Sequence, residues 1–170
     1  MPTKEITQGD LLYHSVHGLC RVDDVVKGDP TRDETPSYSL VPKTPNKMKV
    51  RFVVRAADIE VSGFHTLISE KKANEILQYL KAGNLSAVCD GNPTWLLAKA
   101  ILSCSQENLE VKDIKKRQML ERSAKSLVRE LAFVLKMTLG QTASNIQKCL
   151  GNRTRISPFV LTALAHAGED

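Results

Sequence analysis

The chain has 170 residues, of which 42% are hydrophobic and 25% charged, a composition that suits one or two compact domains with buried cores. No stretch approaches the roughly 18 to 20 apolar residues needed to cross a bilayer, and residues 1–5 lack the apolar core of a signal peptide. We therefore expect a cytoplasmic protein without membrane contact. The four cysteines form no C-x-x-C pair, so neither a zinc site nor a disulfide framework is indicated.

The formal net charge of +5 is unevenly distributed. Residues 1–68 carry nine Lys/Arg and nine Asp/Glu, whereas residues 69–170 carry fifteen and ten, so the whole excess (15 − 10 = +5) lies in the second part. A basic module joined to a neutral one is typical of a polyanion-binding protein. The alternative is a basic surface that only keeps the protein soluble.

The first part of the chain reads as a small antiparallel β-barrel of the SH3-like or Tudor-like kind. Two strands within residues 9–22 fold back at His17-Gly18, where glycine can take a positive φ. Residues 27–37 are rich in turn formers and predict a loop. Further strands are predicted at residues 38–42, 48–55, with a turn at Pro45-Asn46 between them, and 59–61.

Apolar residues alternate with other residues along 48–55, as in a strand with one buried face. The pattern directs Met48, Val50, Phe52 and Val54 inward and the intervening side chains to solvent, namely Lys49, Arg51, Val53 and Arg55. Strands at the edge of such a sheet can pair with a strand of another protein. His14, His17 and Cys20 could be read as metal ligands, but no fourth ligand joins them, so we expect the imidazoles to stabilise the hairpin through hydrogen bonds and expect no metal.

The second part has the apolar spacing of helices. Ser69 and Gly83 mark the two ends of the first helix, and Asn92-Pro93 begins the second. The longest helix is predicted at about residues 112–136, a shorter one at residues 143–150 capped by Thr142, and a last one at residues 159–164.

Cations recur every seven residues on the longest predicted helix. Lys115, Arg122, Arg129 and Lys136 share a line, with Lys125 beside it, opposite a seam formed by Leu120, Ala124, Leu127, Leu131 and Leu135. Such a row suits contacts to phosphates, which bind without reading sequence. Solubilising an exposed helix is the alternative role.

Trp95, the single tryptophan, lies in the first turn of the second predicted helix, about 120° around from the apolar Ile101. An exposed tryptophan is typical of an interface. Packing against the first helix or the barrel is the other interpretation.

Several segments of the chain stand in a distinctive order and together cover residues 9–150. They are GDLLYHSVHG, the pair SLV and KVRFVV, the helix ISEKKANEILQYLK, and RQMLERSAKSLVRELAFVL followed by a short helix. In this order they resemble the CarD/CdnL/TRCF family of RNA-polymerase-interacting proteins. The resemblance implies a barrel that binds the lobe of the RNA polymerase β subunit by strand pairing and helices that contact promoter DNA beside the melted region. By resemblance, Arg51 matches a polymerase-contacting arginine, Lys27 falls near another basic contact position, and Arg117 matches a lysine on the DNA backbone.

The chain departs from that family between its first two helices. Family members carry there a further helix with an N-W-x-R-R segment whose tryptophan wedges into the minor groove, whereas this chain has only residues 84–91. Trp95 is not at the matching position, so DNA wedging is less supported than polymerase binding.

We therefore expect an α+β, multi-domain protein that is not an enzyme. Residues 1–66 would form an antiparallel barrel binding RNA polymerase, and residues 67–170 a basic all-α domain contacting promoter DNA, mainly its phosphates. The candidate polymerase-binding residues are Lys27, Lys49, Arg51, Val53 and Arg55, and the candidate DNA-binding residues are Trp95, Lys115, Arg117, Arg122, Lys125 and Arg129.

A bacterial, nucleoid-associated regulator of transcription initiation follows from this interpretation, with no cofactor and no small-molecule substrate. Two alternatives stay open. One is a protein adaptor without nucleic-acid contact, and the other is a helix-turn-helix protein that reads DNA with residues 142–150.

Overall fold

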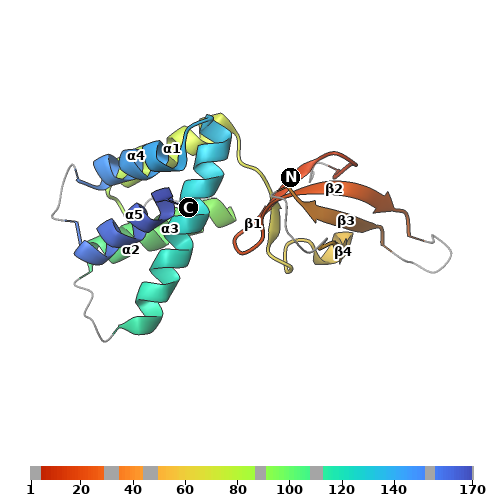
Figure 1. The fold of residues 1–170 in the computed structure, drawn as a ribbon, viewed down its shortest axis with the longest axis horizontal. Coiled ribbons are helices and arrows are strands. Elements are labelled where there is room, and N and C mark those ends of the chain that lie inside the picture. Colours follow the sequence, from red (N-terminus) through yellow and green to blue (C-terminus); the bar gives the residue numbers. More distant parts are fainter. Residues whose placement is uncertain are drawn as a thin grey trace. The chain divides into compact units, whose positions relative to one another are not determined.

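The chain is an α+β protein built as two compact units, Met1–Leu67 and Ile68–Asp170. A computed structural model describes residues 5–28, 35–43, 50–86, 91–107, 113–151 and 156–169. The first unit holds a curled antiparallel sheet and the second holds helices (Figure 1). Within the described residues, no helix is both long enough and apolar enough to cross a membrane.

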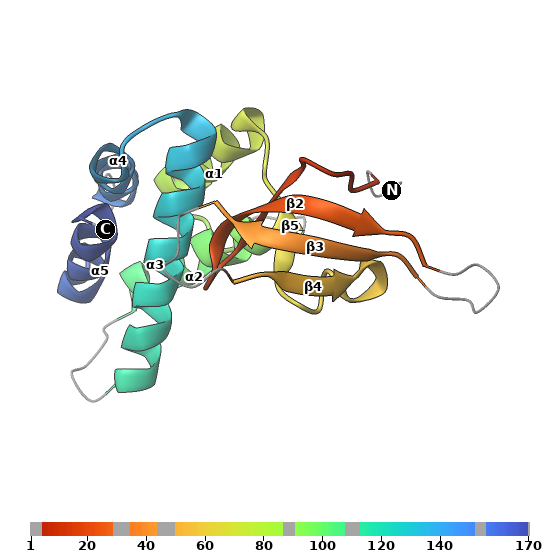
Figure 2. The same ribbon diagram turned by 45° about the vertical axis from the view of Figure 1, so that its right-hand side comes forward.

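The sheet of the first unit has five strands in the order β4-β3-β2-β1-β5. Their bounds are β1 Leu11–His14, β2 Gly18–Val26, β3 Ser37–Pro42, β4 Phe52–Arg55 and β5 Phe64–Thr66. Every neighbouring pair is antiparallel, and β1 pairs with both β2 and β5. Figure 2 shows β2, β3 and β4 side by side, with β4 at the edge of the sheet.

One face of the sheet forms the core of the first unit. Alternate residues of the strands supply it, so that Leu12, Val22 and Leu40 are wholly buried and Phe52 and Val54 of β4 pack against them. The predicted hairpin is confirmed, with Gly18 at φ 69° beginning β2. The predicted alternation in β4 is confirmed too, because Arg51, Val53 and Arg55 are exposed.

The predicted strand at residues 59–61 is wrong. A short 3₁₀ turn at Ala56–Asp58 follows β4, and residues 59–63 continue as turns in which Val61 is 90% exposed. The last strand is β5, whose residues pair with β1. The predicted turn at Pro45-Asn46 and the start of the 48–55 strand lie outside the described residues, as does the middle of the 27–37 loop.

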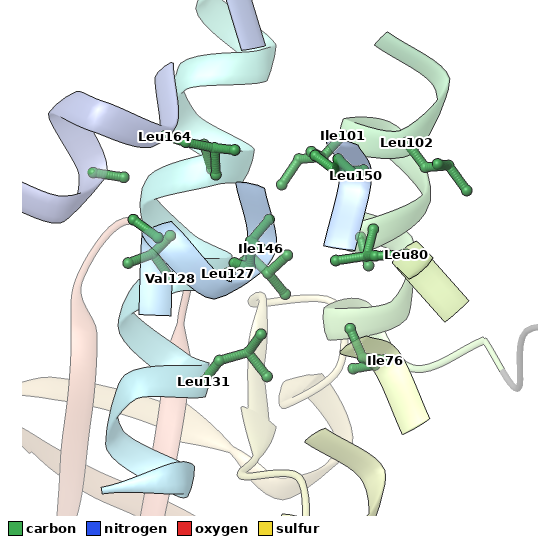
Figure 3. Packing of buried hydrophobic residues seen from close by; sticks show 14 of the residues in the cluster. Ile76, Leu80, Ile101, Leu102, Leu127, Val128, Leu131, Ile146, Leu150 and Leu164 are labelled. Carbon is green, nitrogen blue, oxygen red and sulfur yellow. The ribbon is translucent and has the colours of Figure 1, made fainter. Parts of the chain in front are cut away.

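The second unit contains five helices within its described residues. They are α1 Glu70–Ala82, α2 Pro93–Gln106, α3 Ile114–Leu135, α4 Leu139–Gly151 and α5 Pro158–Glu169. α3 contacts each of the others and is buried over most of its circumference. In Figure 3, Leu127 and Leu131 of α3 approach Ile146 of α4, with side chains of α1 and α2 close by.

Local signals set both ends of α1 and the start of α2 as predicted. The Ser69 hydroxyl accepts a hydrogen bond from the Lys72 amide at 3.2 Å, and Gly83 ends α1 in the left-handed conformation at φ 66°. The Asn92 side chain accepts from the Thr94 amide at 2.9 Å, one residue beyond Pro93.

The prediction that Thr142 caps the fourth helix is wrong. Helix α4 begins at Leu139, and Thr138 and Gln141 form a reciprocal capping box in which each side chain accepts from the other's amide at 3.1 Å. Thr142 is buried inside the helix, where its hydroxyl donates to the Thr138 carbonyl. Helix α5 is also longer than predicted.

Candidate binding surfaces

The first candidate surface is the outward side of β4, formed by Val53 and Arg55 together with Arg51, the residue just before the strand, and we call it the β4 edge surface. Val53 is 71% exposed, and both arginines are exposed on either side of it. Among the described strands, β4 ends the sheet and pairs on one side only, with β3. An edge of this kind presents backbone donors and acceptors to an incoming strand.

Ion pairs hold both arginines of this surface. Arg51 donates to Asp23 of β2 at 2.9 Å, and Arg21 approaches the same carboxylate at 3.4 Å. Arg55 pairs with Asp58 at 2.7 Å. Exposed pairs of this kind add little stability, about 0 to 1 kcal/mol each, so a partner's carboxylate can replace the internal one at small cost.

The two remaining polymerase-contact candidates have different outcomes. Lys27 is exposed directly after β2 ends. The register Val26 to Ser37 to Arg55 puts it at the Arg55 end of the sheet, away from Arg51. Lys49 lies outside the described residues.

His14 stabilises the hairpin by hydrogen bonds, as the sequence suggested. Its Nδ1 accepts from the amides of Val16 at 3.0 Å and His17 at 3.2 Å, and its Nε2 lies 3.1 Å from the Ser62 carbonyl. Because Nδ1 accepts, the ring is neutral with its hydrogen on Nε2. Burial lowers the pKa of His14, and a positive charge on His17, stacked at 4.5 Å, would lower it further.

Acidification below the ordinary histidine pKa of about 6.5 is expected to destabilise the sheet unit through His14. His14 takes up its proton at a higher pH in the unfolded chain than in the folded one. The contribution of neutral His14 to the free energy of unfolding is therefore fully present above the pKa of the unfolded chain and is lost as the pH falls toward the lowered pKa of the folded chain. Urea unfolding followed by backbone NMR signals of the sheet, at neutral and mildly acidic pH, measures this loss.

Two matched variants test whether the His14 imidazole causes that loss of stability. His14→Asn keeps a side-chain acceptor for the turn amides but does not titrate, so it should unfold with less pH dependence than the parent protein. His166→Asn, at an exposed position on α5, should behave as the parent does. Equal pH dependence in His14→Asn and the parent would contradict the expectation.

The second candidate surface lies on α3 and consists of Lys115, Arg122, Lys125 and Arg129, which we call the α3 cationic face. Lys115 and Arg122 are exposed, and Lys125 and Arg129 are half-buried. The buried residues of α3 lie mostly on other sectors of the helix, and near its start Ile114, Gln118, Met119 and Glu121 are exposed as well. Lys136 leaves the row, because it ends the helix in the left-handed conformation at φ 54°.

Arg117 lies apart from that face. Its guanidinium sits 4.6 Å from the ring centroid of Phe159, which joins α3 to α5 by a cation–π contact. Neighbouring Lys116 pairs with Glu107 at 2.9 Å. The fold therefore gives Arg117 a packing contact within the helical unit, and its contact with DNA stays a prediction.

Trp95 packs within the helical unit. Its ring meets Tyr79 of α1 edge to face, with 4.9 Å between centroids, and the half-buried side chain lies against the helical core. This contact favours the packing interpretation over a free wedge.

Helix α4, the reading helix of the helix-turn-helix alternative, buries Thr142, Ile146 and Leu150. Its other face carries exposed Gln141 and Lys148 with half-buried Ser144 and Asn145 between them. That polar face could contact DNA, so the alternative stays a prediction.

Three residues with notable surroundings were not singled out from the sequence. Asp23 binds Arg51 from 28 positions away, and no local pattern indicates that pairing. Glu130 is wholly buried on α3 and accepts from the Thr94 hydroxyl at 2.9 Å. Phe133 is 41% exposed on α3. It follows Arg129 by four residues, a spacing from which the sequence alone could have placed the two side chains next to each other on the helix.

A scan against models of protein families found no match to this chain, and a search of curated proteins found no match either, so its candidate functions rest on these surfaces and on the sequence resemblance.

Proposed function

We propose that the chain is a non-enzymatic transcription regulator of the CarD/CdnL type, whose first unit is a Tudor-like module that binds the lobe of the RNA polymerase β subunit. The observation that carries the proposal is the β4 edge surface. It combines an edge strand with outward Arg51, Val53 and Arg55 in the segment that resembles the family's polymerase-binding strand.

The backbone of β4 supplies the affinity in this proposal. A strand of the partner adds to the sheet beside β4, and its amides and carbonyls pair with those of the edge. Val53 offers an apolar contact at the centre of the strand, because it is 71% exposed. Arg51 and Arg55 favour a partner strand that carries carboxylates, which exchange with Asp23 and Asp58.

The helical unit supplies a second contact in the same proposal. Once the first unit is bound to polymerase, the α3 cationic face meets the phosphates of promoter DNA. Phosphate contacts alone do not read base sequence, so the promoter is selected by the polymerase and not by this chain. The protein-adaptor alternative keeps the first contact and lacks the second.

Arg51→Glu is expected to weaken binding to the isolated β lobe by about 2 kcal/mol, because it replaces a charge-assisted hydrogen bond with a repulsive carboxylate. Fluorescence anisotropy or calorimetry with the full chain and the purified lobe measures this change. No binding of the parent protein to the lobe would refute the proposal.

Arg21→Glu is the matched control. Arg21 shares the Asp23 carboxylate and is exposed, but it lies on β2 in the interior of the sheet. The same change of charge there should have less than half the effect. If both variants lost equal affinity, net charge and not the β4 edge would determine the binding.

A further inference from the structure

The two end strands of the sheet are joined by aromatic side chains. In the described part of the chain, β4 pairs with β3 and β5 pairs with β1, and the backbones of β4 and β5 are not paired with each other. The rings of Phe52 on β4 and Phe64 on β5 nevertheless lie 5.8 Å apart between centroids. Side chains therefore connect the two ends of the curled sheet where backbone pairing does not.

His17 adds a further ring to this contact, from the turn between β1 and β2. The centroid of its ring is 4.4 Å from that of Phe52, 4.5 Å from that of His14 and 6.4 Å from that of Phe64. The angles between the ring planes are 34°, 27° and 23°, so His17 lies roughly face to face with each of them. Tilted and stacked rings at such separations attract one another. We call His14, His17, Phe52 and Phe64 the ring cluster.

Within the ring cluster, His17 links the β1–β2 turn to β4. In the sheet, β2 and β3 lie between β1 and β4, so this link is made by side chains alone. The His17 ring projects from a fixed backbone, because the His17 amide donates to Nδ1 of His14 at 3.2 Å. On β4, Phe52 precedes Val53, whose side chain points to the opposite face of the strand. The His17 ring therefore supports β4 from the face opposite the β4 edge surface.

We propose that His17 is a positioning residue for the β4 edge surface, because its ring, stacked on Phe52, holds β4 extended for an incoming strand. A strand with backbone pairing on one side only needs such support from its side chains. When β4 is already extended, less conformational freedom is lost as the partner strand pairs with it, and the affinity is higher. This inference rests on the proposed function and deepens it, since it names a residue outside the contact surface that sets the strength of the contact.

Amide hydrogen exchange of the full chain, followed by NMR, measures how readily β4 opens. His17→Ala should raise the exchange rates of the β4 amides by about tenfold, because β4 loses a ring contact, and those of the amides that join β2 to β3 by less than about threefold. The same variant should weaken binding of the full chain to the isolated β lobe of RNA polymerase by about fivefold, since β4 then has to be ordered on binding.

Two further variants separate positioning from a general loss of stability. His17→Phe keeps a flat ring, and the backbone amide still donates to His14, so β4 exchange and lobe affinity should stay within about twofold of the parent values. Val25→Ala removes methyl groups from the same core on β2, two strands away from β4. It should destabilise the sheet without opening β4 selectively, and it should leave lobe affinity within about twofold of the parent value.

The outcomes separate this inference from the function on which it rests. If the parent protein binds the lobe and His17→Ala binds it equally well, the positioning role is overturned and the proposed function remains. Equal acceleration of exchange in β4 and between β2 and β3, or equal loss of lobe affinity in His17→Ala and Val25→Ala, also overturns it, because the effect would then be one of general stability. No binding of the parent protein to the lobe overturns the proposed function and the role of His17 in it together.

Discussion

Trp95→Ala is expected to lower the free energy of unfolding of the helical unit by about 3 kcal/mol, the lower end of the range for deleting a large aromatic from a core. The half-buried ring packs on the helical core and meets Tyr79 edge to face, and the variant loses both contacts. Urea unfolding followed by far-ultraviolet circular dichroism measures the loss.

Leu96→Ala is the control for this prediction, since the neighbouring side chain is 54% exposed and its removal should change stability by less than about 0.5 kcal/mol. The experiment also decides what Trp95 does. A DNA-inserting wedge would leave stability unchanged and reduce promoter opening by polymerase, which is the result that contradicts a packing role.

Replacing Lys125 and Arg129 together with alanine is expected to weaken binding to duplex DNA about a hundredfold at about 0.05 M salt. Each phosphate contact contributes about 0.9 to the slope of log affinity against log salt, so losing two should flatten the slope by up to about 2. The fall should be similar for duplexes of unrelated sequence, because phosphates carry no sequence information.

Lys81→Ala combined with Lys148→Ala removes the same charge from exposed positions on α1 and α4. That double variant should keep most of the parent's slope if the contact is on α3. An unchanged slope in the Lys125 and Arg129 variant would remove the DNA contact from the proposed function and leave the protein adaptor. Equal flattening in both variants would show a diffuse charge effect.

Elements with local signals were predictable from the sequence. Helix-end signals depend only on residues close by in the sequence. The structure bears out the helix ends marked by Ser69, Gly83 and Asn92-Pro93. The outward direction of Arg51, Val53 and Arg55 follows from the period of a strand, which is also a local property.

The errors arose where several local signals competed. Ile59 and Val61 suggested a strand, but the chain forms turns there and continues to β5, a strand of only three residues, Phe64–Thr66. Thr142 fits an N-cap as well as Thr138 does, yet only Thr138 has glutamine three positions later to complete the box.

Contacts between distant residues could not be predicted from one sequence. From the sequence, Arg117 looks like an ordinary surface cation. In the structure, its guanidinium packs over the ring of Phe159 of α5. Glu130 reads as part of a solvated helix, yet the helices around α3 bury it completely. In both cases the environment is created by tertiary packing and leaves no mark on neighbouring positions.

The pairing of β1 with β5 determines when the sheet can be completed during synthesis. Leu12 pairs with Thr66, so the second neighbour of β1 emerges from the ribosome only after more than fifty further residues have been made. Closing so long a loop is slow compared with forming a hairpin or a helix. The β1–β2 hairpin therefore waits with one edge open, and a nascent chain arrested between β4 and β5 would expose the edge of β1 to other strands.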